Sequence, residues 1–131
     1  MKKILVVEDD VKIAHALAIR LKAEGYQPIV AYDALTALTS AMKHQPDLIL
    51  LDVSLPLGGG FSTIERLHNL PTPTMIPFIV VTAGKELDLR RRARELGASG
   101  FFEKPYDPQR LLAAIRIELG EAAVNVDEWA A

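Results

Sequence analysis

The feature that most constrains the fold is a run of four apolar residues that ends in a single carboxylate. This run, residues 48–51, lies between Pro46 and Pro56, and Asp52 follows it directly. A short apolar run with such boundaries is typical of a strand buried on both faces, as in the middle of a parallel sheet. Asp52 would then lie at the carboxyl end of the strand, where open α/β sheets bind their ligands. Taken alone, Asp52 is better explained as a residue that caps a turn, because Asp is common at the ends of elements.

Four other short segments have the same strand-like character, and helical patterns separate them. This alternation predicts an α/β fold, a doubly wound five-stranded parallel sheet with five helices and right-handed crossovers. The predicted strands are residues 4–7, 28–32, 48–51, 78–81 and 100–103; the predicted helices are about 11–24, 34–44 and 61–70, a segment between Thr82 and Gly97, and a segment that begins at Pro108.

The spacing of apolar residues predicts which face of each helix is buried. The expected inward side chains are Ile13, Leu17 and Leu21 in the first helix, Leu35, Leu38 and Met42 in the second, Leu89, Ala93 and Leu96 in the fourth, and Leu111, Leu112, Ile115 and Leu119 in the last. The fourth helix also carries Arg90, Arg91, Arg92 and Arg94, which form either a solvated face or a docking surface.

Composition excludes several classes of protein. With 131 residues the chain forms one domain, and its net charge of −2 gives no bulk electrostatic case for binding nucleic acid or a membrane surface. No apolar run approaches the length of a membrane span. The absence of cysteine excludes disulfides and thiolate metal sites and favours a cytoplasmic protein. The glycines at 58–60 lack the Lys and Ser/Thr of a phosphate-binding P-loop.

Polar residues follow four of the five predicted strands. Glu8 and Asp9 follow the first strand, Asp52 the third, Thr82 the fourth and Lys104 the fifth. Parallel strands present their carboxyl ends at one edge of the sheet, so these side chains should meet there. Each has an ordinary explanation as a cap or turn residue, but four such coincidences at one edge are improbable.

This set of residues favours phosphoryl chemistry. Clustered carboxylates without His or Cys suit a hard divalent cation, and Mg²⁺ fits a few carboxylates and several retained waters. A lysine supplies a compact positive charge for a phosphate oxygen, and a carboxylate can act as the nucleophile that forms an aspartyl phosphate. Phosphoryl transfer requires mainly positioning and charge neutralisation, which this set supplies. Asp10, which follows the acidic pair, is better explained as a helix cap.

The chain resembles the receiver domain of bacterial two-component response regulators, a chemotaxis-type, flavodoxin-like fold with strand order 2-1-3-4-5. The resemblance covers residues 1–120 and leaves 121–131 as a C-terminal extension or linker stub. It rests on four segments that occur in order: residues 4–10, residues 50–56 with Gly60 and Phe61, residues 80–83, and residues 100–105.

The resemblance implies a phosphorylation-dependent signalling switch. Asp52 would accept a phosphoryl group from a histidine kinase or a phosphotransfer protein. Asp9, Asp52 and the backbone carbonyl of Ser54 would hold Mg²⁺, and Glu8 would act through water. The protein would be a phosphoacceptor that assists its own phosphorylation and dephosphorylation, and not an enzyme with a turned-over substrate.

The resemblance also implies how the signal leaves the site. Lys104 would pair with the phosphate, and its bond to Pro105 is commonly cis in this family. Thr82 and Phe101 would form a switch pair, with Phe101 moving inward from a more exposed position. A downstream protein would bind the altered surface around Arg90, Arg94, Phe101 and Arg110, and a phosphorylation-dependent dimer is one further outcome.

Three departures and two rival functions accompany this interpretation. Ser54 and Gly59 replace larger or polar residues that are common in the family, and residues 98–101 lack the acidic pattern of winged-helix regulators. No effector domain follows, so we expect no direct nucleic-acid binding and either a stand-alone receiver or a fragment. A phosphatase of the haloacid dehalogenase type would need Asp-x-Asp after the first strand, where this chain has Glu8 and Asp10. A degenerate receiver would lack one of the acidic or lysine residues, and all are present.

Overall fold

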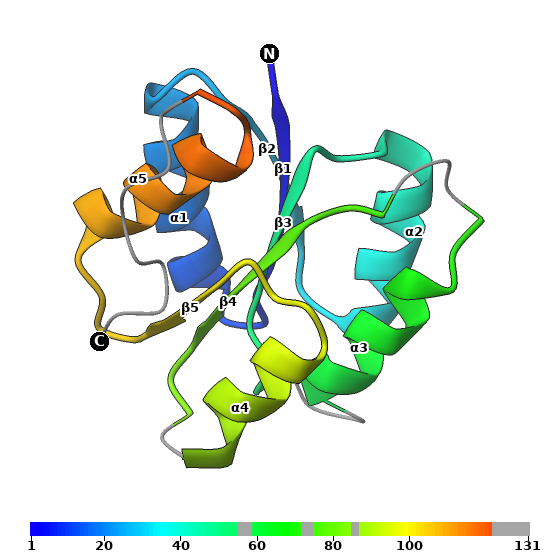
Figure 1. Cartoon of the computed structure of the whole chain (residues 1–131). Coiled ribbons are helices and arrows are strands. Elements are labelled where there is room, and N and C mark those ends of the chain that lie inside the picture. The colour runs from blue at the N-terminus through cyan, green and yellow to red at the C-terminus, as the bar shows by residue number, and fades with distance from the viewer. Residues whose placement is uncertain (55–58, 72–74, 85–86, 122–131) are drawn as a thin grey trace.

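The computed structural model describes residues 1–54, 59–71, 75–84 and 87–121, and it has one parallel five-stranded sheet in the order β2-β1-β3-β4-β5 between two layers of helices (Figure 1). The predicted α/β architecture and strand order are therefore confirmed. The elements are β1 Lys3–Val7, α1 Val11–Ala23, β2 Gln27–Ala31, α2 Ala34–His44, β3 Leu48–Leu51, α3 Gly59–His68, β4 Phe78–Thr82, α4 Leu87–Glu95, β5 Gly100–Glu103 and α5 Pro108–Glu118.

The strand register brings the carboxyl ends of the strands to one edge. Val7 at the end of β1 lies opposite Ala31 of β2 and Leu51 of β3. At the β4–β5 end of the strand order, Thr82 at the end of β4 lies opposite Glu103 of β5. The residues that follow these ends are therefore neighbours in space, although up to 96 positions separate them in the sequence.

Alternate residues of each strand pack into two separate cores, one on each face of the sheet. In β1, Leu5 and Val7 pack into the core under α2, α3 and α4, while Ile4 and Val6 pack into the core under α1 and α5. Side chains that point to opposite faces along a strand explain why the central strands are apolar throughout. Figure 1 shows α1 and α5 together on one side of the sheet, with α2 and α3 on the other.

The predicted buried face is right for α4 and α5. Ala93 is fully buried, and Leu89 and Leu96 pack against the same core. In α5, Leu111, Leu112 and Ile115 are buried and Leu119 packs beside them.

The predicted buried face is wrong for part of α1 and most of α2. Leu17 and Leu21 are buried, but Ile13 is 40% exposed. In α2, Leu35 is 74% exposed and Met42 is 51% exposed, and the helix instead buries Ala37 and Ala41. Leu38 is half-buried. Small side chains let α2 lie close to the sheet, so the larger residues of the stripe end on its outer flank.

Aspartate caps begin three of the helices, and the cap at Asp10 was predicted. Asp10 accepts hydrogen bonds from the amides of Lys12 and Ile13 at the start of α1. Asp33 accepts from the amide of Thr36 in α2, and Asp107 precedes Pro108 at the start of α5. No helix among the described ranges is long and apolar enough to span a membrane.

Candidate functional site

The polar residues predicted at the strand ends come together at the carboxyl edge of the sheet. Glu8 directly follows β1, Asp52 directly follows β3, Thr82 ends β4 and Lys104 directly follows β5. Glu8, Asp52 and Thr82 are each at most 5% exposed. The fold thus holds two carboxylates and a hydroxyl out of water at one point, which is unusual for residues that serve only as caps.

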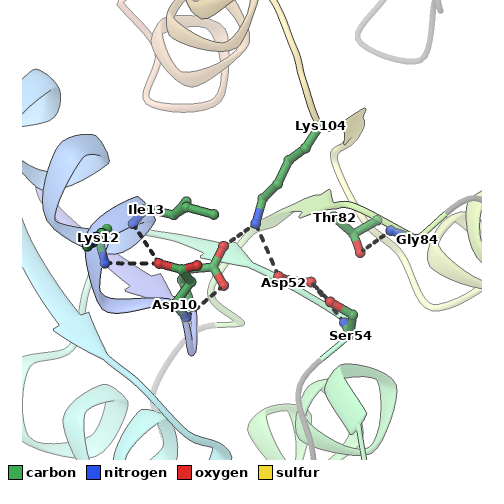
Figure 2. Close-up of polar contacts among 9 residues, drawn as sticks. Asp10, Lys12, Ile13, Asp52, Ser54, Thr82, Gly84 and Lys104 are labelled. Atoms are coloured by element: carbon green, nitrogen blue, oxygen red, sulfur yellow. Dashed lines mark hydrogen bonds and ion pairs between the residues drawn. The ribbon is translucent and has the colours of Figure 1, made fainter.

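Lys104 joins the two buried carboxylates. Its ammonium donates to Oε1 of Glu8 and lies 3.2 Å from Oδ2 of Asp52, as Figure 2 shows for Asp52. The peptide bond between Lys104 and Pro105 is cis, as the resemblance implied. Burial alone would lower the pKa of Lys104, but its bonds to Glu8 and the charge of Asp52 outweigh burial and raise that pKa above its ordinary value.

Asp52 is held in place by the residue two positions further along the chain. The amide of Ser54 donates to Oδ1 of Asp52 at 2.8 Å, and the Ser54 hydroxyl donates to the same oxygen at 2.6 Å (Figure 2). Burial would raise the pKa of Asp52, but these two bonds and the ammonium of Lys104 hold the pKa below its usual value. Asp52 is therefore ionised at neutral pH and oriented from both sides.

The pKa of Glu8 is shifted in the opposite direction to that of Asp52. Burial raises the pKa of Glu8 to about 7, and the negative charge of Asp52 adds to the rise. The bonds from Lys104 and from the amide of Asp10 act in the other direction without reversing it. The described residues of the site therefore carry more negative charge than the ammonium of Lys104 can neutralise.

Three carboxylates lie close enough to share a metal ion. Glu8, Asp9 and Asp52 each offer a carboxylate oxygen, and these oxygens lie within 4.8 Å of one another. Glu8 and Asp52 are buried and Asp9 is exposed, so one side of the group stays open to water. Three carboxylates facing one ammonium suit a divalent cation, and the all-oxygen donor set with access for water suits Mg²⁺. The described residues therefore fit the magnesium site that the sequence suggested.

Thr82 and Phe101 are both buried on the β4–β5 side of the site. The Thr82 hydroxyl accepts a hydrogen bond from the amide of Gly84 at 3.1 Å (Figure 2). Phe101 is only 2% exposed, and the guanidinium of Arg90 lies 5.1 Å from the centre of its ring. The structure thus has Phe101 in an inward position, covered by an arginine from α4.

Sequence reasoning missed the close contact that places α3 against the site. A Cβ atom on Gly60 would lie 2.2 Å from Cα of Val53 and 2.9 Å from the carbonyl oxygen of Asp52. Gly60 is therefore required for the close approach of α3 to the end of β3. Sequence reasoning also missed the guanidinium of Arg92, which lies 4.2 Å from the ring centre of Phe61. No local sequence pattern signals a contact between residues on two different helices.

Comparison with known families and structures agrees with this geometry. The family model described as the response regulator receiver domain matches residues 4–116. Among solved structures, the CheY-like response regulator receiver domain protein from Methanospirillum hungatei superimposes with a TM-score of 0.84 at 32% identity, covering 92% of this chain and 95% of that chain.

Curated relatives cover only part of longer proteins. The phosphate regulon transcriptional regulatory protein PhoB of Escherichia coli is 37% identical over 115 residues, which are 88% of this chain and 50% of that protein. The response regulator PleD of Caulobacter vibrioides is 40% identical over 114 residues, which are 87% of this chain and 25% of that protein. The chain therefore spans half or less of the length of these two relatives.

Proposed function

This chain belongs to the response regulator receiver domain family, and from that membership we propose that it is a phosphorylation-dependent switch whose phosphoacceptor is Asp52. A histidine kinase or a phosphotransfer protein would donate the phosphoryl group. The observation that carries the proposal is the buried ion-paired group in which Lys104 contacts both Glu8 and Asp52. Such a group is costly to bury and is explained by a phosphoryl group that replaces the contact of Lys104 with Asp52.

The reaction that we propose is an in-line displacement at phosphorus. A carboxylate oxygen of Asp52 forms the new bond to phosphorus, the bond from phosphorus to the donor atom breaks, and the electron pair leaves with the donor. Two bonds from Ser54 orient the Asp52 carboxylate for this attack. Lys104 would pair with one phosphoryl oxygen, and the Thr82 hydroxyl would donate to another.

Asp9, Asp52 and the backbone carbonyl of Ser54 would hold Mg²⁺, with Glu8 acting through water. The ion would neutralise charge on the phosphoryl group during transfer. This arrangement makes the protein a participant in its own phosphorylation and dephosphorylation.

The proposed output is a change of the surface beside Phe101. When Thr82 is drawn toward the phosphate, the space behind β4 favours the inward position of Phe101, and the phosphoryl group biases two existing states. Arg90 and Arg94 on α4 and Arg110 on α5 would line the altered surface, which a downstream protein or a second phosphorylated copy would bind. Because Phe101 is inward here, the phosphorylated state should keep this position and the unphosphorylated state should sample a more exposed one.

We propose that residues 1–120 are the receiver unit and that 121–131 are an extension or linker stub, of which 122–131 lie outside the described residues. This unit would bind no nucleic acid itself. The relatives named as transcriptional regulators are longer proteins, so any such output would come from outside the receiver unit. We propose a cytoplasmic protein that does not bind membranes, which fits the absence of cysteine and the net charge of −2.

Mass spectrometry after incubation with a small phosphodonor and Mg²⁺ tests the proposal. We expect one added phosphoryl group that is labile in base, and no label on Asp52→Asn or without Mg²⁺. Asp9→Asn should also abolish labelling, because it removes a direct metal ligand. Asp10→Asn is the matched control. Asp10 caps α1 and is not a proposed metal ligand, so this variant should be labelled at Asp52 like the parent.

A second experiment on the parent protein tests the switch. Aromatic NMR with and without beryllofluoride, a phosphate mimic, should show the environment of Phe101 change together with that of Thr82. Equal labelling of Asp52→Asn would refute the phosphoacceptor, whereas shifts confined to the surroundings of Asp52 would refute only the switch.

A further inference from the structure

A cavity of about 430 Å³ opens between α3 and α4, directly beside the phosphoacceptor. Its walls include Ser54, Phe61, Glu65, Gly84 and Arg92. Two of these residues also belong to the site, because Ser54 donates to Asp52 and the amide of Gly84 donates to Thr82. A molecule in this cavity would therefore contact Ser54 and Gly84, which are hydrogen-bonded to Asp52 and Thr82.

Two glycines beside this cavity leave no room for a side chain. A Cβ atom on Gly84 would lie 2.4 Å from Cδ1 of Leu89, which also lines the cavity. Gly60 lets α3 approach Val53, which also lines the cavity. Side chains at Gly60 and Gly84 would therefore collide with residues that line the cavity or precede it.

Arg92 is the cation among the described residues that line this cavity, and its guanidinium lies over an aromatic ring. The guanidinium lies 4.2 Å from the ring centre of Phe61. Its neighbour Arg91 forms ion pairs with Asp88 and Glu95, whereas within the described residues Arg92 forms no ion pair or hydrogen bond. A guanidinium stacked on a ring keeps its N–H groups at the edge of the plane, in the fork geometry that matches a carboxylate.

From these observations we infer that Arg92 is a specificity-determining residue that recognises the carboxylate leaving group of a small acyl phosphate. The inference rests on the proposed phosphorylation of Asp52. In that step a carboxylate oxygen of Asp52 bonds to phosphorus while the bond from phosphorus to the acyl oxygen breaks. The electron pair stays on the acyl oxygen, and the donor leaves as a free carboxylate without any proton transfer. Arg92 would pair with the negative charge that develops on this leaving group.

Glu65 gives the inference a second and opposite test. Glu65 lines the same cavity, but no ion pair within 4 Å joins it to Arg92 among the described contacts. Its carboxylate should repel an anionic leaving group that Arg92 attracts. Removing the charge of Glu65 should therefore speed the reaction that removal of Arg92 slows.

The experiment compares two donors whose leaving groups differ in charge. Acetyl phosphate releases acetate, and phosphoramidate releases ammonia, which offers Arg92 no negative charge. We expect Arg92→Ala to lower the rate constant for labelling of Asp52 by acetyl phosphate roughly tenfold, less than the loss of a buried transition-state donor would, because Arg92 is exposed. Labelling by phosphoramidate should stay at the parent rate. Arg92→Lys should fall between the two, since it keeps the charge and loses the planar fork.

Two further variants complete the experiment. Arg91→Ala is the matched control and should leave both rates unchanged, while Glu65→Gln should raise only the acetyl phosphate rate. Equal loss with both donors on Arg92→Ala, or no loss with either, would overturn the role of Arg92. Phosphoramidate labelling also reports whether each variant is folded. If neither donor labels the parent protein, the proposed phosphoacceptor fails; a labelled parent with an unselective Arg92 refutes only this inference.

Discussion

The two edges of the sheet use similar polar residues in opposite ways. At the amino edge each described contact joins one donor to one acceptor: the Lys3 amide donates to Asp47 at 2.8 Å, and the Tyr26 hydroxyl donates to Glu121 at 2.6 Å. At the carboxyl edge, Glu8 and Asp52 share the ammonium of Lys104. Each of these two amino-edge carboxylates thus has a neutral donor of its own. The carboxyl edge is left with excess negative charge, a cost in stability that is typical of a functional site.

The pKa values of one buried group at each edge show the same contrast. Burial raises the pKa of Tyr26 to about 12, and the bond to Glu121 adds to the rise, so Tyr26 is neutral throughout the physiological pH range. Burial raises the pKa of Glu8 to about 7, so this carboxyl changes its charge within that range. The stability of the carboxyl edge should therefore depend on pH near neutrality, and that of the amino edge should not.

Among variants at the two edges, Glu8→Gln should change the free energy of unfolding most. Unfolded Glu8 ionises near its ordinary pKa of 4.5, and folded Glu8 ionises near 7. Below pH 4.5 the carboxyl is protonated in both states and contributes no difference. Between pH 4.5 and 7 the unfolded state loses its proton first, so the free energy of unfolding falls as pH rises, by up to about 3 kcal/mol above pH 7. Glu8→Gln should remove this loss.

Urea denaturation in a chelator at pH 4 and at pH 8 measures this effect. The variant should be more stable than the parent at pH 8 by about 2 kcal/mol, since the lost contact with Lys104 offsets part of the gain. The two proteins should be close in stability at pH 4. A variant that is less stable than the parent at pH 8 would show that the carboxyl edge is not under electrostatic strain.

A smaller effect of opposite sign is expected at the amino edge from Tyr26→Phe. This change removes the hydroxyl that donates to Glu121 and keeps the buried ring. The loss of one hydrogen bond to a carboxylate should lower the free energy of unfolding by about 1–2 kcal/mol. Because Tyr26 is neutral on both sides of neutrality, the loss should be equal at pH 6 and pH 8. A loss that changes between these two pH values would place a titrating group at this edge as well.

The smallest effect should follow Arg116→Ala. Arg116 pairs with Glu24 at 3.1 Å, and the two side chains are 40% and 37% exposed. Exposed ion pairs of this kind contribute little, so we expect a loss below about 1 kcal/mol that shrinks as salt is added. Thermal unfolding at low and high salt measures it. A loss larger than that of Tyr26→Phe would mean that this ion pair stabilises the amino edge more than the hydrogen bond of Tyr26 does.

The strands and the composition of the site could be predicted from the sequence. Apolar runs of four or five residues identified the buried strands, because a parallel strand covered on both faces must be apolar throughout. The same topology predicted that Glu8, Asp52, Thr82 and Lys104 meet, since parallel strands have their carboxyl ends at one edge. Asp10 was predicted as a cap from its position alone, and its bonds to two amides confirm this.

Only the tertiary structure decided how deeply each side chain is buried and what it contacts. The apolar spacing of α2 predicted that Leu35 and Met42 face the core, yet the alanines of the helix lie against the sheet and leave both exposed. The position of the Arg92 guanidinium over the ring of Phe61 and the raised pKa of Glu8 likewise have no counterpart in local sequence. The physical reason is that a local pattern encodes periodicity and polarity, whereas burial depends on how closely two elements approach. That distance is determined by side chains from distant parts of the chain.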